Sequence, residues 1–235
     1  MKNLPLTICL TLAVLLGSTG TNWGADFEKG LAAAQSGDFA TALREWKPLA
    51  EQGVASAQFN LGFMYKNGEG VPQDYKTAVK WFSLAAEQGY ADAQNNLGFM
   101  YRRGHGVPQD YQIARKWYTL AAEQGDVYAQ YNLGLMYYNG LGVPQDYKTA
   151  LNWYTLAAEQ GVADAQYNLG WMYRYGQGVP QNYVYAYMWG DIANVNENQN
   201  GTELRNIAAK KMTAAQIAKA QELASDCVRK KYKGC

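Results

Sequence analysis

The chain has 235 residues, of which 48% are hydrophobic, and it carries 21 lysines and arginines against 20 aspartates and glutamates. The apolar content is sufficient for a packed core, which argues against a disordered polypeptide. The nearly balanced charge gives no net field that would attract nucleic acid or anionic lipid, so nucleic acid is not expected among the partners.

The N-terminal segment has the pattern of a signal peptide. Lys2 precedes an apolar run from Leu4 to Leu16, and small residues follow as far as Gly20. We therefore predict a signal peptide over residues 1–25, with cleavage after Gly20 or Ala25 left open. The run is shorter than the roughly 20 residues that a membrane-spanning helix needs, so the mature chain should lack a membrane span and be periplasmic or secreted. An uncleaved anchor is the alternative.

Residues 26–53 are predicted to form a helical hairpin that caps the N-terminal end of the fold. Apolar residues recur at helical spacing on both sides of the Ser36-Gly37-Asp38 turn, including Leu31 before it and Trp46 after it.

Residues 54–193 contain four copies of a 36-residue repeat. The segment Val-Pro-Gln-Asp-Tyr begins at Val71, Val107, Val143 and Val179, with Asn182 replacing the aspartate in the last copy. Asn-Leu-Gly and Ala-Glu-Gln-Gly recur on the same period, except that the last repeat lacks the second of these endings. A period of this length is typical of stacked supersecondary units.

Each repeat is predicted to be a pair of helices. In the first copy, Ala57, Leu61 and Met64 lie on one face of a first helix. The glycines of Gly68-Glu69-Gly70 permit the positive φ angles that end a helix. Asp74 then provides an N-cap for a second helix from Tyr75 to about Glu87.

Two further features describe the packing that we expect between these helices. Ala78, Trp81 and Ala85 form the apolar stripe of the second helix. Gly62 lies in the middle of the first helix, and glycine recurs there in every copy, at a cost of roughly 1 kcal/mol relative to alanine. We interpret it as a place where the backbone of another helix approaches closely.

Residues 194–235 are predicted to form a C-terminal cap of two helices. Thr202 and Thr213 are the expected N-caps, and Gln216 completes a capping box with Thr213. Cys227 and Cys235 are the only cysteines outside the predicted signal peptide, and an oxidising compartment would allow them to form a disulfide. Two free thiols are the alternative.

The repeat resembles the Sel-one-like repeat, a relative of the tetratricopeptide repeat. The resemblance rests on Ala-Gln-Tyr-Asn-Leu-Gly-Leu-Met-Tyr at 129–137, the glycine-containing loop at 140–147 and Ala-Ala-Glu-Gln-Gly at 157–161, and it extends over residues 27–193. It implies an all-α fold, a right-handed α/α superhelical solenoid of helix-turn-helix repeats. It also implies a non-enzymatic adaptor or scaffold that binds proteins, often in the bacterial periplasm or outside the cell. The partner and the oligomeric state are not implied.

Some exported members of this family carry a cysteine pair in every repeat and are associated with β-lactam binding or hydrolysis. No repeat of this chain contains a cysteine, which argues against that alternative. Attachment to cell-wall glycan is a further alternative.

No catalytic residue, cofactor or metal site is predicted. His105 is the only histidine, and it occupies a loop position held by other residue types in the other copies. The glycine-containing loops have no preceding strand and no Lys-Ser/Thr, so they are interpreted as turns rather than phosphate cradles. The glutamates of the Glu-Gln endings are spread one per repeat, and we expect them to hydrogen-bond loop backbone rather than to form an acid/base pair.

A partner-binding surface is predicted from positions of the first helix that vary between copies. They are spaced i, i+4 and i+7 and point away from the invariant apolar face. Such a stripe would line a concave groove, and aromatic and arginine residues are common anchors of protein interfaces. Filling of gaps between repeats is the alternative role. The candidates are Phe63, Lys66, Phe99, Arg102, Tyr131, Tyr138, Tyr167, Trp171 and Arg174.

Overall fold

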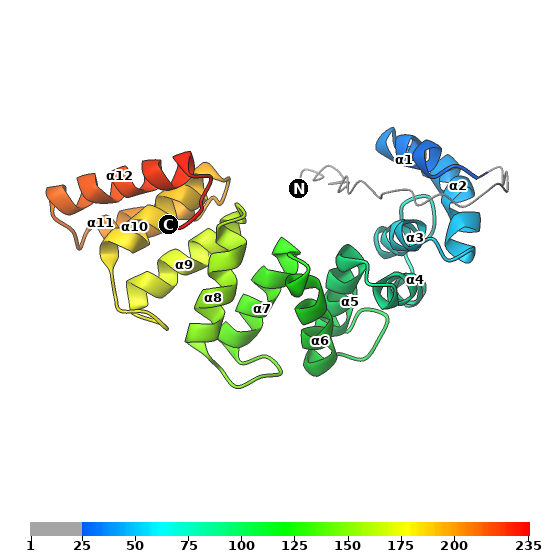
Figure 1. Cartoon of the computed structure of the whole chain (residues 1–235), viewed down its shortest axis with the longest axis horizontal. Coiled ribbons are helices and arrows are strands. Elements are labelled where there is room, and N and C mark those ends of the chain that lie inside the picture. The colour runs from blue at the N-terminus through cyan, green and yellow to red at the C-terminus, as the bar shows by residue number, and fades with distance from the viewer. Residues whose placement is uncertain (1–24) are drawn as a thin grey trace. The chain divides into compact units, whose positions relative to one another are not determined.

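The computed structural model describes residues 25–235, so nearly all of the predicted signal peptide lies outside the described part. Within this range the chain forms twelve helices and no strand (Figure 1). The prediction of an all-α repeat solenoid is confirmed. The helices are α1 (Phe27–Gln35), α2 (Phe39–Glu51), α3 (Ala55–Asn67), α4 (Tyr75–Glu87), α5 (Ala91–Arg103), α6 (Tyr111–Glu123), α7 (Val127–Asn139), α8 (Tyr147–Ala158), α9 (Ala163–Tyr175), α10 (Tyr183–Val195), α11 (Gly201–Ala209) and α12 (Ala214–Arg229).

The chain divides into two compact units, one ending at Gln88 and one running from Gly89 to Cys235. In the first unit α1 packs on α2, α2 on α3 and α3 on α4. In the second, α5 pairs with α6, α7 with α8 and α9 with α10, and α11 and α12 both pack on α10.

The first unit begins with the predicted hairpin. Trp46 is buried in its core together with Leu61 and Met64 of α3, and its indole N–H donates to the Phe27 carbonyl at 3.1 Å. The Trp46 ring also lies where a side chain at Gly30 would be, since a Cβ added there would come within 2.5 Å of the indole nitrogen. The hairpin is therefore closed around one tryptophan.

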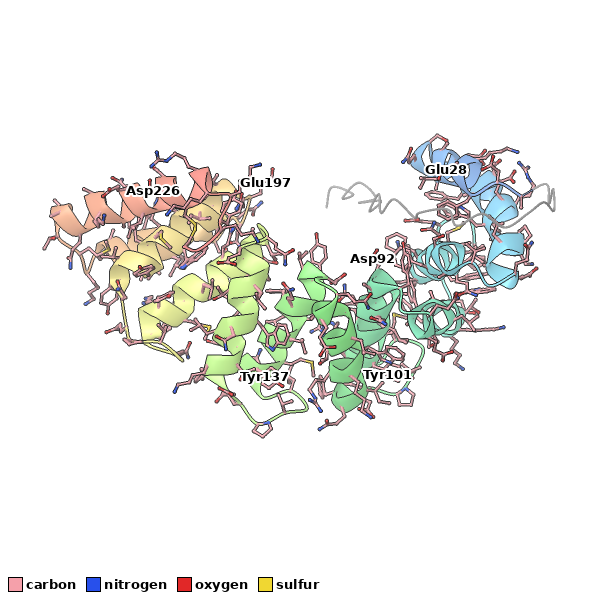
Figure 2. All side chains as sticks on the ribbon, viewed as in Figure 1. Glu28, Asp92, Tyr101, Tyr137, Glu197 and Asp226 are labelled. Carbon is pink, nitrogen blue, oxygen red and sulfur yellow. A yellow bond between two sulfur atoms is a disulfide. The ribbon has the colours of Figure 1, made fainter. Side chains whose placement is uncertain are left out.

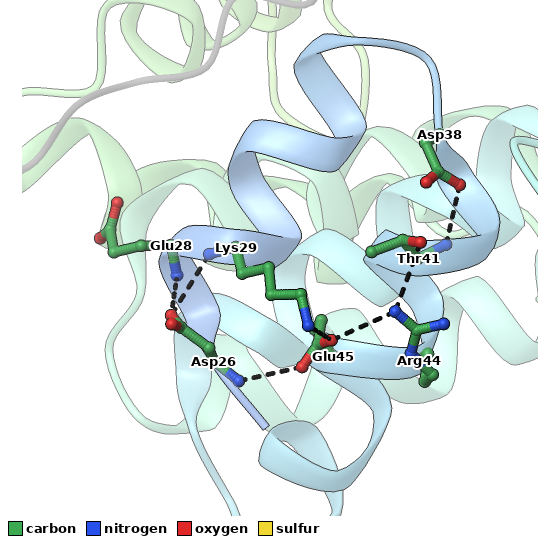
Figure 3. A network of polar contacts seen from close by, with 7 residues as sticks. All are labelled: Asp26, Glu28, Lys29, Asp38, Thr41, Arg44 and Glu45. Carbon is green, nitrogen blue, oxygen red and sulfur yellow. Dashed lines mark hydrogen bonds and ion pairs between the residues drawn. The ribbon is translucent and has the colours of Figure 1, made fainter. Parts of the chain in front are cut away.

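A buried carboxylate ties α1 to α2 (Figure 3). The Glu45 side chain is 4% exposed and lies 2.7 Å from Lys29 Nζ. It also accepts from the Asp26 backbone N–H at 3.2 Å and from the Arg44 guanidinium at 3.4 Å. The hydrogen bond with Lys29, followed by that with Asp26, holds the pKa of Glu45 below its ordinary value.

The Val-Pro-Gln-Asp-Tyr segment joins the two helices of a repeat through four local hydrogen bonds, as in the third copy. The Gln145 amide donates to the Tyr138 carbonyl at 2.7 Å, which satisfies a group at the end of α7. The Asp146 backbone N–H donates to the Tyr137 carbonyl at 2.9 Å, and its carboxylate caps α8 through the N–H groups of Lys148 and Thr149. The predicted N-cap role of Asp74 in the first copy is confirmed in the same way.

Two structural constraints require glycine at Gly142, the second glycine of this loop. Gly142 has a φ of 69°, a left-handed value that favours glycine. A Cβ there would also lie 2.6 Å from the Cβ of Tyr111, the first residue of α6 in the preceding repeat. The loop of one repeat thus rests on the second helix of the repeat before it.

A buried glutamine near the start of the first helix is hydrogen-bonded to the ends of the second helices before and after it. Gln130 of α7 donates to the Ala122 carbonyl and accepts from the Gln160 amide at 2.8 Å. Gln58 and Gln94 accept in the same way from Gln88 and Gln124. The glutamine of the Ala-Glu-Gln-Gly ending, rather than its glutamate, therefore makes the hydrogen bond that joins the end of a repeat to its first helix.

The glutamates of these endings do not hydrogen-bond the loop backbone as we expected. Glu51, Glu87 and Glu123 are exposed. Glu159 does accept a backbone hydrogen bond, but from Gly234 in the C-terminal tail.

Expectations about packing and capping are refined or corrected at three points. Trp81 of the predicted stripe is half-buried and packs against the core, and the fully buried aromatic residue of α4 is Phe82, which the stripe did not include. In the first three repeats the mid-helix glycine makes room for an aromatic ring rather than for a helix backbone, since a Cβ at Gly62 would lie 2.6 Å from Phe82 Cδ1. In the fourth repeat the expected close backbone is present, because a Cβ at Gly170 would lie 3.2 Å from the Ala186 carbonyl oxygen of α10. Thr202 lies inside α11, whose N-cap is Asn200, and donates its hydroxyl to Asn194 Oδ1 at 2.6 Å. The capping box of Thr213 and Gln216 is confirmed.

Candidate functional site

The predicted binding residues lie on the first helices of the repeats, and all nine are half-buried. Phe63 and Lys66 belong to the first unit, on α3, where Lys66 Nζ lies 5.1 Å from the centre of the Phe63 ring. Burial lowers the pKa of Lys66. These two side chains pack against each other.

The other seven candidates belong to the second unit, on α5, α7 and α9, and we call them the helix-A face. Two hydrogen bonds connect the three helices: Asn132 of α7 donates to Asn95 of α5 at 3.2 Å, and the Tyr138 hydroxyl donates to Gln177, just after α9, at 2.9 Å. The structure therefore brings these positions onto neighbouring helices. Their role in binding stays a prediction.

An aromatic row runs along α9. Tyr167 and Trp171 meet edge to face with ring centres 6.0 Å apart, and Trp171 stacks on Tyr175 at 5.3 Å. The Arg174 guanidinium lies 4.6 Å from both the Trp171 and Tyr175 ring centres and donates to the Tyr175 hydroxyl at 2.7 Å. Tyr175 is 56% exposed and was missed by the sequence analysis, although its i+4 spacing from Trp171 indicated it.

Tyrosines from two helices gather at α7. The rings of Tyr131 and Tyr138 lie 5.8 and 6.4 Å from that of Tyr154 on α8, and Tyr138 also meets Tyr147 edge to face at 5.3 Å. Tyr154 is fully buried, and within residues 25–235 its hydroxyl has no hydrogen-bond partner. Burial raises its pKa.

Arg102 forms the corresponding cluster on α5. Its guanidinium lies 5.4 Å from the centre of the Phe99 ring and beside the buried Tyr118 of α6. Burial raises the pKa of Tyr118 to about 12, and the positive charge of Arg102 opposes this shift. Both Arg102 Nε and the Tyr118 hydroxyl are buried without a hydrogen-bond partner among the described residues.

Acidic side chains are found at the other end of the same helices. Asp92 lies in the first turn of α5, Asp126 caps α7 and Asp164 lies in the first turn of α9. Figure 2 shows Asp92 and Tyr101 at opposite ends of α5. A pocket of about 320 Å³ opens at this acidic end, lined by residues that include Tyr128, Asp164 and Glu197. α5 and α9 therefore carry carboxylates where they begin and arginines where they end, whereas α7 has a carboxylate at its start and no basic residue in its last turn.

In the part of the chain that the structure covers there is neither a candidate metal cluster nor a helix that could span a membrane. Over residues 25–235 no three His, Cys, Asp or Glu side chains are grouped as metal ligands. The His105 ring packs edge to face on Phe99 at 5.9 Å. None of the twelve helices is long and apolar enough to cross a membrane.

A disulfide joins Cys227 to Cys235 and closes a C-terminal tail that contacts the end of the third repeat and the residue after α10. The Tyr232 hydroxyl donates to Asn196 Oδ1 at 2.8 Å, and the Gly234 N–H donates to Glu159 at 2.9 Å. The tail thus covers the region where α8 ends and α10 ends.

Comparison with solved structures shows several proteins of the same fold. A protective antigen of uropathogenic Escherichia coli with the SLR fold is 41% identical with a TM-score of 0.80, over 88% of this chain and 44% of that one. This chain therefore spans less than half the length of that relative. A Sel1 repeat protein of Oxalobacter formigenes is 29% identical with a TM-score of 0.75, over 86% and 84% of the two chains.

Three more comparisons bear on the family. A protein of Klebsiella pneumoniae described as a sel1 repeat protein is 22% identical with a TM-score of 0.52, over 78% of this chain and 91% of that one, and shows the fold alone. No curated protein matches the sequence. The family model of the Sel1 repeat matches residues 55–90, 91–126, 127–162 and 163–193, which is more than half of the chain. The chain belongs to the Sel1 repeat family.

Proposed function

We propose that this protein is a non-enzymatic scaffold of the bacterial envelope or secreted space that binds a protein segment on the helix-A face. Sel1 repeats typically form protein-interaction scaffolds, and the fold is generally non-catalytic. Beyond this general property of the family, we assign the binding surface to the helix-A face and the protein to an exported compartment.

One observation carries the choice of surface. The positions that stay the same between repeats, such as Leu133 and Met136, are buried in the core. The positions that differ keep part of their surface in contact with solvent and hold Arg102, Tyr138 and Trp171. Residues of these types supply much of the binding energy in protein interfaces, where rigid side chains lose little conformational entropy.

Export is supported by the signal-peptide pattern and by the disulfide. A disulfide persists in the periplasm or outside the cell, whereas the cytosol reduces it. The relative from Escherichia coli is described as a protective antigen, a property that agrees with an exported protein. Fractionation of a bacterial host expressing the chain with and without residues 1–25 tests this assignment, and retention of both forms in the cytosol would contradict it.

The binding surface is tested by affinity capture from an envelope extract. The purified protein is compared with the triple variant Arg102→Ala/Tyr138→Ala/Arg174→Ala, and a double variant at exposed positions of the second helices, Lys116→Ala/Lys148→Ala, serves as the control. A partner retained by the wild type and the control but lost by the triple variant supports the proposal. Equal capture by all three proteins places the site elsewhere. Far-UV circular dichroism establishes that each variant is folded.

A further inference from the structure

We propose that the segment bound on the helix-A face is acidic, with one carboxylate placed on Arg102 and a second on Arg174. This inference rests on the proposed function and specifies the chemistry of the partner.

Arg102 lies beside a second donor that also lacks an acceptor. Its Nε and the Tyr118 hydroxyl are both buried, and neither finds a hydrogen-bond partner within the described residues. The loop position after α9 that supplies Gln177 to Tyr138 is occupied by Leu141 after α7, and leucine has no acceptor. Arg102 is only half-buried, so a carboxylate of the partner can accept a hydrogen bond from its guanidinium, whereas the fully buried Tyr118 hydroxyl lies out of the partner's reach.

Arg174 is held in place by aromatic rings rather than by a carboxylate. Its guanidinium contacts the faces of Trp171 and Tyr175 and makes one hydrogen bond to the Tyr175 hydroxyl. Over residues 25–235 neither Arg174 nor Arg102 forms an ion pair with an acidic side chain. A guanidinium fixed in this way loses little entropy when it binds a carboxylate.

The acidic groups of the same helices are too far away to neutralise these arginines. Asp92 and Asp164 lie in the first turns of α5 and α9, whereas Arg102 and Arg174 lie in the last turns. A helix rises about 1.5 Å per residue, so ten positions separate the two charges by roughly 15 Å, more than a Debye length in physiological salt. The last turns of α5 and α9 therefore carry arginines with no acidic residue of the same helix nearby; from the next helix, Asp110 lies at the end of α5, where its N–H donates to the Tyr101 carbonyl at 3.0 Å.

The spacing of the repeats defines the partner further. Successive first helices pack on the second helix between them at about 8–10 Å, and hydrogen bonds join α5 to α7 and α7 to the residue after α9, so Arg102 and Arg174 are separated by on the order of 20 Å. An extended peptide covers about 3.3–3.6 Å per residue, which corresponds to two acidic residues about six positions apart. Tyr138 lies on α7, between α5 and α9 in the series of first helices, and its half-buried ring can contact an apolar or aromatic residue of the partner.

The test begins with selection of random 12-residue peptides displayed on phage against the purified protein. We expect enrichment of peptides with two Asp or Glu residues about six positions apart. Fluorescence anisotropy with a labelled selected peptide should then show binding at least tenfold weaker for Arg102→Gln and for Arg174→Gln, and weaker binding at 500 mM than at 50 mM NaCl.

A matched control and a charge exchange make the test specific. Arg115→Gln is the control, since Arg115 is also half-buried with a buried, unpaired Nε, but it belongs to α6. Its affinity for the peptide should be unchanged. Arg102→Glu should bind the acidic peptide poorly and regain affinity when one acidic residue of the peptide is replaced by lysine. Such a gain cannot come from a loss of folding.

Two results would overturn the inference in different ways. If the selected peptides lack acidic residues, or bind equally well after both acids are changed to amides, while the triple variant still abolishes binding, the acidic partner is wrong and the binding face stands. If no variant of the face weakens the selected peptides, both the acidic partner and the proposed face are wrong.

Discussion

At the scale of single residues, the glycine in the middle of each first helix is set by one aromatic neighbour. A Cβ at Gly134 would lie 2.5 Å from Tyr154 Cδ1, and one at Gly98 would lie 2.8 Å from Tyr118 Cδ1. In the fourth repeat the neighbour differs, because Gly170 faces Leu204 of α11 and the α10 backbone. In the first three repeats the glycine is therefore required by the aromatic ring, and in the fourth it is required by the packing of the C-terminal cap.

The substitution Gly134→Ala tests this explanation. Helix propensity alone favours alanine by about 1 kcal/mol, but the clash with Tyr154 forces a rearrangement that typically costs about 1–3 kcal/mol. We expect a lower urea midpoint for Gly134→Ala. The double variant Gly134→Ala/Tyr154→Ala should lose less stability than the sum of the losses in the two single variants, because removal of the ring removes the clash. A raised midpoint for Gly134→Ala would contradict the close contact.

At the scale of elements, the start of α7 differs from the other first helices. Val54, Tyr90 and Val162 occupy the N-cap positions of α3, α5 and α9 without a side-chain cap, whereas Asp126 caps α7. Its carboxylate accepts from the Ala129 N–H at 2.6 Å. Burial, with a smaller contribution from the negative charge of Asp92, nevertheless raises the pKa of Asp126 from 3.8 to about 6.

This raised pKa predicts a pH dependence of stability with a defined sign. Between about pH 4 and pH 6 the folded chain binds more protons at Asp126 than the unfolded chain, so stability falls as pH rises through this window and is constant above it. Asp126→Asn keeps an N-capping side chain without the charge. We expect the variant to be more stable at pH 7, on the order of 1 kcal/mol after allowance for solvent screening.

Thermal unfolding from pH 4 to pH 8 measures this effect. The difference in Tm between Asp126→Asn and the wild type should be small near pH 4 and reach its full value above pH 6. A difference that is the same at every pH would mean that the charge of Asp126 is not the cause. Asp146→Asn, which changes an exposed N-cap with a lowered pKa, should not show this pattern.

At the scale of the whole molecule, stability is distributed over neighbouring helices. The helices contact chiefly the next helix along the chain, and the C-terminal end depends on α12 packing on α10 and on the disulfide-bonded tail. In such a chain a local change is felt mainly by the neighbouring units.

Loss of the disulfide tests this distribution. Closing the short loop between Cys227 and Cys235 stabilises the end by roughly 2–3 kcal/mol on the chain-entropy model. In Cys227→Ser/Cys235→Ser we expect faster amide hydrogen exchange in α10 and α12 and unchanged exchange in the first unit, which ends at Gln88. Faster exchange throughout α1 to α4 would show that the chain unfolds as one cooperative block.

Much of the fold could be predicted from the sequence because its signals are local. The 36-residue period, the capping aspartates and the glycine-containing loops act through hydrogen bonds and φ angles within a few residues, so the solenoid and the bounds of α4 follow from them. The degree of burial of the binding candidates could not be predicted from these local signals. Periodicity places a residue on a face, but only packing decides how much of it the next repeat covers.

The sequence by itself thus determined the helices, their caps and the all-α architecture, because each depends on neighbours along the chain. Only the tertiary structure decided that Phe82 rather than Trp81 fills the core, that Gln130 bonds Gln160, and that Arg102 lies beside the unpaired hydroxyl of Tyr118. These contacts join different helices, and their partners are selected by shape, burial and hydrogen-bonding demand when the helices pack.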